Sequence, residues 1–472
     1  MKIFSLFMVL PLSLLWAVNT GAGTPLKENS DSLNPTHPPY QLLRFMEDYT
    51  YLEDHPNRGF WDKGKHLKPA DAWRITFGGQ ERIRYEHKTN LGFGGAVPAT
   101  DGFLINRLRG HMDAKYKNNF RIFADVKSAV SHDREGSKAL TDDSIDTQNL
   151  FVEFITHPNP SESLSLRIGR QELVFGKQRL LTNLIWANVL RTFDGIRFTY
   201  QTQHGSGNRT VSGWWARFVN VKNGQLNRSD PSLQTFGLYA ATTLSKHGGY
   251  DLYAIGKRQS DQPASQGPAT DTSVTIGTRV WGLMADLWQY ETELAVQPGR
   301  FESEDTFAWM VSATIGTDLP YPVLEKLSFG YDYASGDDDG TGKDTFDQYF
   351  PLGHAYFGYI DVVGRANIQA VNTRLDFKLI PKTNSWIQLH SFWLAEVEDG
   401  LYNPGGKRIR SNRTGNSSTH AGIELDIATK VKIGRHSGLL FGYSRLWPGS
   451  FIENTGPDEE IDFFYAQYQF TF

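Results

Sequence analysis

The sequence contains no cysteine among its 472 residues. This absence excludes disulfide bonds, thiolate zinc sites and a cysteine nucleophile. After the amino terminus no apolar run is long enough to cross a bilayer as a helix, and the mean hydropathy of -0.43 is that of a polar chain. The formal net charge is -4, so no global positive field favours nucleic acid as a partner. Aromatic residues (13%) and glycines (45) are abundant instead, as long half-buried strands would require.

The amino terminus has the order of a secretory signal. Lys2 precedes an apolar run over residues 3–18, and the small residues Gly21, Ala22 and Gly23 follow. This order predicts a signal peptide over residues 1–22, cleaved after Ala22, and a mature protein outside the inner membrane. The alternative is an amino-terminal membrane anchor, for which the apolar run is short.

Alternation of apolar and polar residues dominates the chain after residue 72. In the final segment one face carries Phe464, Ala466, Tyr468, Phe470 and Phe472. The same period of two recurs over residues 104–116, 307–316, 327–334 and 420–427, with charged residues repeatedly on the second face. A transmembrane β-barrel turns its apolar face to lipid and its polar face to a water-filled lumen, whereas a soluble β-sandwich buries the apolar face. The pattern therefore favours the barrel.

The lengths of the connections between predicted strands give a second indication. Short connections fall at residues 117–119, 157–163, 246–249, 285–286 and 381–384. Long ones fall at residues 87–101, 131–146, 170–192, 259–271, 336–366, 398–416 and 448–460. Short periplasmic turns and long extracellular loops are typical of outer-membrane barrels. The sequence predicts an all-β fold, a transmembrane antiparallel β-barrel of about 18 strands over residues 73–472.

Residues 23–72 lack this alternation. They contain Pro35, Pro38, Pro39, Pro56 and Pro69 and a short helical pattern over residues 42–49. We interpret this region as a periplasmic lead-in or partial plug, placed before the barrel in the chain.

Motifs along the predicted barrel point to one family. The first strand reads Gly78-Gly79-Gln80-Glu81-Arg82-Ile83-Arg84-Tyr85-Glu86. A central region reads Gly169-Arg170-Gln171-Glu172-Leu173, followed by Phe193-Asp194-Gly195. A late region reads Gly330-Tyr331-Asp332-Tyr333-Ala334-Ser335-Gly336-Asp337, followed by Pro351-Leu352-Gly353-His354. In this order, and over nearly the whole chain, these motifs resemble the alginate export porin family of Gram-negative outer membranes.

The resemblance implies an outer-membrane porin that passes an anionic exopolysaccharide, alginate or an alginate-like polyuronate, outward by passive diffusion. It implies neither catalysis nor a cofactor. The expected partners are the anionic polysaccharide, outer-membrane lipid and lipopolysaccharide, and periplasmic export scaffold proteins. Nucleic acid is not expected, and the barrel is expected to be monomeric.

Arginine suits a path for a polyuronate, because its planar guanidinium binds carboxylates with two parallel hydrogen bonds and stays charged. The residues that we assign to the substrate path are Arg82, Arg84, Arg107, Arg109, Arg167, Arg170, Glu172, Arg179, Arg191, Asp194 and Arg197. We expect the narrowest region to be lined by Arg170, Arg179 and Arg191, with Glu172 and Asp194 paired to them. The alternative is that several arginines brace the barrel wall through Glu86, Asp125 or Glu153.

Three other functions fit parts of the sequence. An uptake porin for small anionic solutes or sugar acids would share the barrel, and a structural barrel would have a plugged lumen. A barrel enzyme would use His354 beside Asp347 and Asp361, although a loop-anchoring histidine is the favoured interpretation. A metal site is not expected: the candidate calcium ligands Asp337, Asp338 and Asp339 lack the remaining positions of an EF-hand loop.

Overall fold

The computed structural model describes residues 37–472 except residues 54, 56–57, 206, 246–247, 265–266, 339–342 and 413–417. The predicted signal peptide and residues 23–36 of the predicted lead-in lie outside the described residues. Among the described helices, none has the length and apolar character needed to span a membrane.

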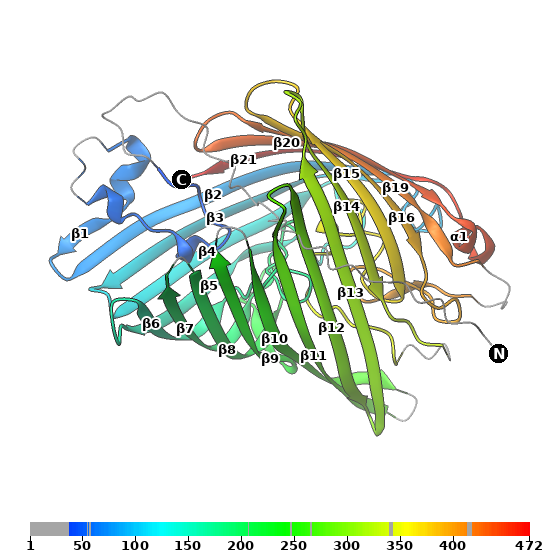
Figure 1. The fold of residues 1–472 in the computed structure, drawn as a ribbon, viewed down its shortest axis with the longest axis horizontal. Helices are drawn as coiled ribbons and strands as arrows, with labels where there is room; N and C mark the ends of the chain where they lie inside the picture. The colour runs from blue at the N-terminus through cyan, green and yellow to red at the C-terminus, as the bar shows by residue number, and fades with distance from the viewer. Residues whose placement is uncertain are drawn as a thin grey trace.

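Eighteen antiparallel strands form one closed wall in the described part of the chain (Figure 1). They are β2 (Trp73–Lys88), β3 (Asp101–Tyr116), β4 (Phe120–His132), β5 (Asp143–Thr156), β6 (Glu162–Gln171), β7 (Phe193–His204), β8 (Gly207–Asn220), β9 (Arg228–Ser245), β10 (Gly248–Ala264), β11 (Gly267–Met284), β12 (Trp288–Phe301), β13 (Glu304–Asp318), β14 (Leu324–Ala334), β15 (Ile368–Phe377), β16 (Thr383–Trp393), β19 (His420–Lys432), β20 (Ser437–Pro448) and β21 (Ile461–Thr471). Each strand pairs with the next, and β21 pairs with β2 from Thr471 opposite Gln80 to Phe463 opposite Lys88. This last pairing closes the barrel, so the predicted fold is confirmed.

The remaining elements are short. β1 (Leu67–Ala70) extends the sheet beside β2, and β17 (Leu401–Tyr402) pairs with β18 (Arg408–Arg410) in a separate hairpin. The described residues also form four 3-10 helices and one α-helix: η1 (Arg44–Met46), η2 (Thr50–Leu52), η3 (Phe60–Gly64), η4 (Gly353–Ala355) and α1 (Ser450–Thr455). Figure 1 shows β1 and the first 3-10 helices, in blue, at the end of the wall where the carboxyl terminus also lies.

The alternation in the sequence determines which side chains face lipid. Leu108, Ile196 and Phe307 are exposed on the outer face, whereas Arg107 and Asp251 are buried on the lumen side. Apolar side chains tolerate lipid, and the polar side chains find charged and hydrogen-bonding partners inside the wall. The barrel therefore carries its hydrophobic surface outside and its charged groups inside.

Two details of the predicted connections are corrected by the structure. The predicted loop over residues 259–271 is absent, because β10 and β11 stay paired up to Ala264 opposite Gly267. The long connection predicted from Arg170 begins later, because Arg170 is still part of β6 and lies opposite Asp194 of β7. The period of two continues through both boundaries, so polar composition alone placed the ends of these strands too early.

Two long connections fold into the lumen and meet there. We call residues 172–192 the first inward segment and residues 343–367 the second inward segment. A parallel bridge joins Leu181 to Phe350, and the amide of Thr182 donates to the carbonyl oxygen of Phe350 at 3.0 Å. Phe350 packs its ring against Phe193 at 5.3 Å and against Phe218 at 5.6 Å between ring centroids. The main hydrophobic core of the molecule thus lies inside the barrel, between these segments and the wall.

Candidate functional site

The first inward segment is held to the wall by arginines of β2 and β3. The Arg82 guanidinium donates to the carbonyl oxygens of Ile185, Trp186 and Ala187 at 2.9–3.1 Å. Arg107, which lies directly opposite Arg82 in the sheet, donates to Ile185 and Ala187 at 3.3 and 2.9 Å. Because the acceptors are backbone carbonyls, the positive charge of both groups is left without a neutralising carboxylate.

Arg84 supports the same segment through its ring contact. Its guanidinium lies 3.7 Å from the Trp186 ring centroid and donates to the Glu86 carboxylate at 2.7 Å. On the other side of Trp186, the His354 ring stacks at 3.9 Å and pairs through Nδ1 with Asp361 at 3.0 Å. His354 therefore connects the two inward segments, which supports its interpretation as a loop-anchoring residue.

Arg109 lies in a buried polar cluster at the start of the first inward segment. It binds Asp125 directly and Glu172 at 3.1 Å, and Asn149 donates to the same oxygen of Glu172 at 2.8 Å. Glu172 was expected to pair with Arg170, Arg179 or Arg191, whereas the structure places it against Arg109. The pairing of Arg109 with Asp125 is the bracing arrangement that the alternative interpretation anticipated.

Two other arginines of the assigned path pair across neighbouring strands. Arg170 binds Asp194 of β7 at 2.8 Å and Asp146 of β5 at 3.1 Å. Arg167 of β6 binds Glu153 of β5 at 2.8 Å. These carboxylates neutralise both guanidinium groups within the wall.

The remaining arginines of the assigned path lie deeper, against the inward segments. Arg179 is 2.6 Å from both Glu291 and Glu293 of β12, on the far wall from Arg82. Arg191 donates to the carbonyl oxygen of Pro351 at 2.8 Å, and Arg197 donates to the Ser212 hydroxyl at 3.0 Å. Arg170, Arg179 and Arg191, which we expected to line the narrowest region together, thus each have different partners.

The charge balance differs among these arginines. Within the described residues, four of them form no ion pair with a carboxylate and donate only to carbonyl, amide or hydroxyl oxygens: Arg82, Arg107, Arg191 and Arg197. Charges surrounded by a protein wall of low dielectric constant act over a longer distance than charges in water. Among the described residues, the charges of these four guanidinium groups are therefore not neutralised by an ion pair.

An open cavity lies beside Arg179, between the inward segments and strands β12–β16. The empty volume here is about 560 Å³, which includes space open to solvent. Its lining comprises Lys177, Arg179, Glu291, Thr314, Ser328, Asp332, Ala355, Tyr356, Asn372, Arg374 and Gln388. Three cations against two carboxylates, together with amides and hydroxyls, give it the groups that bind an acidic sugar.

Sequence reasoning missed the β15 contribution to this cavity. Asn372 and Arg374 lie on the same face of β15 as the buried Ala370, which faces the lumen, so the alternation of residues would have identified them.

The turn that brings Lys177 and Arg179 to the cavity depends on Gly176. It has a φ of 52°, and an added Cβ would lie 2.2 Å from the Tyr239 hydroxyl oxygen.

The described part of the lead-in has its Phe45 side chain inside the barrel, at the end where the short connections between strands lie. Phe45 is only 2% exposed and packs edge-on against Phe123 and Phe151, with the Arg167 guanidinium 4.2 Å above its ring. Arg121 donates to the carbonyl oxygen of Phe45 at 2.6 Å. We call the group Arg121, Phe123, Phe151 and Arg167 the Phe45 seat.

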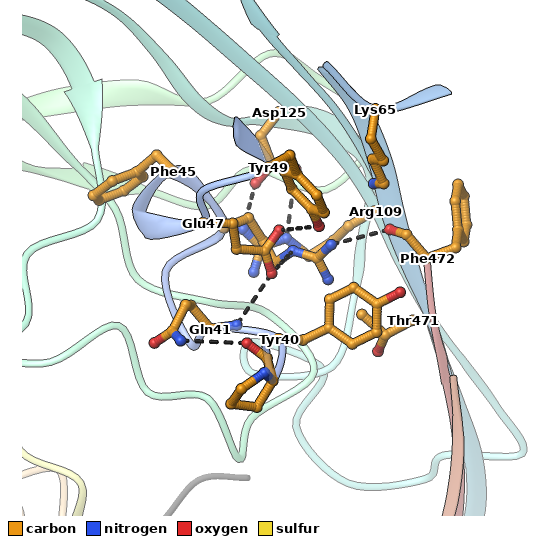
Figure 2. A network of polar contacts seen from close by, with 12 residues as sticks. Tyr40, Gln41, Phe45, Glu47, Tyr49, Lys65, Arg109, Asp125, Thr471 and Phe472 are labelled. Carbon is orange, nitrogen blue, oxygen red and sulfur yellow. Dashed lines mark hydrogen bonds and ion pairs between the residues drawn. The ribbon is translucent and has the colours of Figure 1, made fainter. Parts of the chain in front are cut away.

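A second set of contacts ties the lead-in to the carboxyl terminus of the chain (Figure 2). Arg44 donates to the carbonyl oxygen of Phe472 at 3.0 Å. The two carboxylate oxygens of Glu47 accept hydrogen bonds from the Gln41 backbone amide at 3.1 Å and from the Tyr49 hydroxyl at 2.9 Å. Figure 2 shows Phe45 and Phe472 on opposite sides of this network. The lead-in is thus fixed both inside the lumen and at the seam between β2 and β21.

In the acidic loop, Asp337, one of the weak calcium candidates, has protein partners. Asp337 accepts the Lys343 amide at 2.8 Å, and its own amide donates to Asp399 at 3.2 Å. Asp339 lies outside the described residues. Among the residues that the structure does describe, no group of three or more acidic or histidine side chains is arranged to hold a metal.

A closed barrel of eighteen strands, apolar outside and polar inside, is the architecture of an outer-membrane porin. Residues 73–465 match the family model described as Alginate export, and the chain belongs to this family. The protein is therefore an outer-membrane channel of an export family and not an enzyme. No relative was found among curated proteins.

Solved structures of other bacterial proteins share the fold. OpdO of Pseudomonas aeruginosa is 11% identical with a TM-score of 0.53, covering 84% of this chain and 97% of that one. OccAB4 of Acinetobacter baumannii is 10% identical with a TM-score of 0.55, covering 86% and 100%. OccK2 (OpdF) of Pseudomonas aeruginosa, in complex with glucuronate, is 12% identical with a TM-score of 0.52, covering 86% and 99%. At these identities the likeness concerns the fold alone.

Proposed function

We propose that the chain passes an anionic exopolysaccharide, alginate or an alginate-like polyuronate, out of the periplasm by passive diffusion. The observation that carries this proposal is that four guanidinium groups around the inward segments have no ion-pair partner among the described residues, from which we infer an excess of positive charge there. A linear polyuronate brings one carboxylate per sugar, and a lumen with unneutralised guanidinium groups lowers the free energy of such a chain inside it. The ion-paired arginines add groups that bind the polyuronate weakly, because their own carboxylate partners compete with the polymer for the guanidinium groups.

The assigned residues divide into two roles in this proposal. Arg82 and Arg107 are 3% and 1% exposed, so they supply charge while they hold the first inward segment in place. Direct contact with the polymer falls to the more exposed cations that line the cavity, Lys177 and Arg374, whereas Arg179 is only 4% exposed and supplies charge. Transport needs contacts that are strong enough for entry and weak enough for exit, and Lys177 beside Glu291 and Arg374 beside Asp376 fit that requirement.

The lead-in acts as a plug in this proposal. While Phe45 is in its seat, the lead-in covers the periplasmic entrance, and an arriving polymer has to displace it. Periplasmic export scaffold proteins would deliver the polymer, and outer-membrane lipid and lipopolysaccharide would surround a monomeric barrel. Withdrawal of Phe45 would expose Arg121 and Arg167, two guanidinium groups at the entrance.

Conductance across a planar bilayer tests the proposal. Polymannuronate added on the periplasmic side should block the ionic current of the purified protein, whereas neutral dextran of equal length should not. A channel that is blocked equally by both polymers would contradict the role of charge. A channel that is blocked only by short acids would contradict polymer export.

A second function, uptake of small sugar acids, is favoured by one observation. The cavity beside Arg179 presents three cationic side chains together with amides and hydroxyls, and the similarly folded OccK2 was crystallised with glucuronate. Uptake predicts that glucuronate blocks the current and crosses into liposomes, with no effect of polymannuronate. Export predicts block by the polymer.

A further inference from the structure

The lead-in passes over the rim of the barrel, so that it contacts both sides of the wall. Phe45 lies inside the lumen, and Arg44 contacts the last residue of the chain at the rim. Asp62 of η3 binds Arg435, in the turn between β19 and β20, at 3.1 Å. The two residues just before Asp62, Phe60 and Trp61, are therefore placed near the outer surface of β20 and β21.

Trp61 lies on that outer surface. Its ring centroid is 4.8 Å from that of Phe472 and 5.2 Å from that of Phe470. Phe470 lies on the face of β21 on which Phe464 and Tyr468 are exposed, and Phe472, directly after the strand, has the same parity. The Trp61 ring thus extends the lipid-facing surface of the barrel at its periplasmic edge.

Phe60 extends this surface further. It is 74% exposed and meets Trp61 edge-to-face at 5.0 Å between centroids. A phenylalanine ring exposed to this degree is unfavourable in water, and it adjoins a surface that lipid already covers. Lys63, on the same short helix, is also exposed. Aromatic rings beside a lysine are the composition of a segment at the boundary between acyl chains and headgroups.

We propose that η3 docks on the periplasmic leaflet of the outer membrane. Phe60 and Trp61 enter the boundary between acyl chains and headgroups, and the Lys63 ammonium contacts a lipid phosphate. Continuity with the lipid-facing wall identifies lipid, and not a periplasmic protein, as the occupant of this surface. The lead-in then has a membrane anchor outside the wall and a plug inside it, and this inference holds for any transported substrate.

The experiment uses the absence of cysteine, which makes a single introduced thiol unique. Phe60→Cys and the control Met46→Cys are each labelled with a nitroxide in the full-length protein in phospholipid nanodiscs. Met46 is the matched control, because it is 59% exposed on the same lead-in but follows Phe45 at the lumen side of the rim. A difference in gel mobility between unheated and heated samples confirms that both variants are folded.

Electron paramagnetic resonance then compares collisions of each label with oxygen, which enters lipid, and with a water-soluble nickel complex. At position 60 oxygen should collide more often than nickel, and at position 46 the order should be reversed. Nickel in excess at both positions would overturn the proposal. Adding Lys63→Gln to Phe60→Cys should make the label shallower in nanodiscs with anionic phospholipid, and an unchanged depth would overturn the phosphate contact.

Discussion

Removal of the Phe45 side chain should open the periplasmic entrance. Phe45 is almost fully buried, and its ring fills the space between Phe123, Phe151 and the Arg167 guanidinium. In Phe45→Ala the backbone contact with Arg121 stays available, so the change isolates the contribution of the ring. The expected result is a lead-in that detaches more often while the barrel stays folded.

The size of the effect follows from burial. A Phe→Ala change at a buried site typically costs about 3–5 kcal/mol, and every 1.4 kcal/mol corresponds to a factor of ten in an equilibrium constant. If the full cost falls on docking of the lead-in, the ratio of docked to detached lead-in drops by at least about 100-fold.

Single-channel recording measures this ratio as closed time divided by open time. The control is Phe198→Ala, the same substitution at a lipid-facing position that is 46% exposed. The control should leave the ratio unchanged. An unchanged ratio in Phe45→Ala, or an equal fall in both variants, would refute the assignment of the lead-in as the plug.

Three further predictions concern charge. Replacing Arg82 and Arg107 by Gln should release the first inward segment and lower anion preference, seen as a shift of the reversal potential in a salt gradient; a constant potential would argue against the charge excess. Serine at Arg170, Arg179 and Arg191 should also lower anion preference, and an unaffected preference would show that these side chains lie off the ion path. Burial lowers the pKa of the Lys65 ammonium from 10.5 to about 8, so the detached lead-in binds more protons than the docked one between these values. Docking should therefore strengthen as pH rises from 8 to 10.5, measured by protection of the lead-in from protease, and Lys65→Met should abolish this dependence.

Alternation was sufficient to predict the barrel, because lipid on one side and polar groups on the other impose a period of two on every strand. The outward position of Phe464 and the lumen position of Arg107 both followed from that period. The end of β6 could not be predicted from that period, since Arg170 is as polar as the loop residues after it. Only the pairing of Arg170 with Asp194 identifies it as part of the strand.

The contacts inside the lumen were harder to predict for a different reason. Arg82 and Arg107 bind backbone carbonyls of the first inward segment, and such acceptors exist at every residue and leave no sequence pattern. Opposite charges at Arg170 and Asp194 were predictable as a pair, while Glu172 had several arginines within reach. The packing of Phe45 against Phe123 of β4 and Phe151 of β5 likewise depends on how the lead-in crosses the rim, which no local pattern specifies.

The most direct test of the central claim is the flux of polymer itself. Liposomes that contain the protein are loaded with a fluorescent oligomannuronate and, in a parallel sample, with a neutral dextran of equal length. The account predicts efflux of the oligomannuronate, faster in Phe45→Ala than in the parent protein, and retention of the dextran. Retention of the oligomannuronate by the Phe45→Ala channel, with free passage of glucuronate, would contradict polymer export.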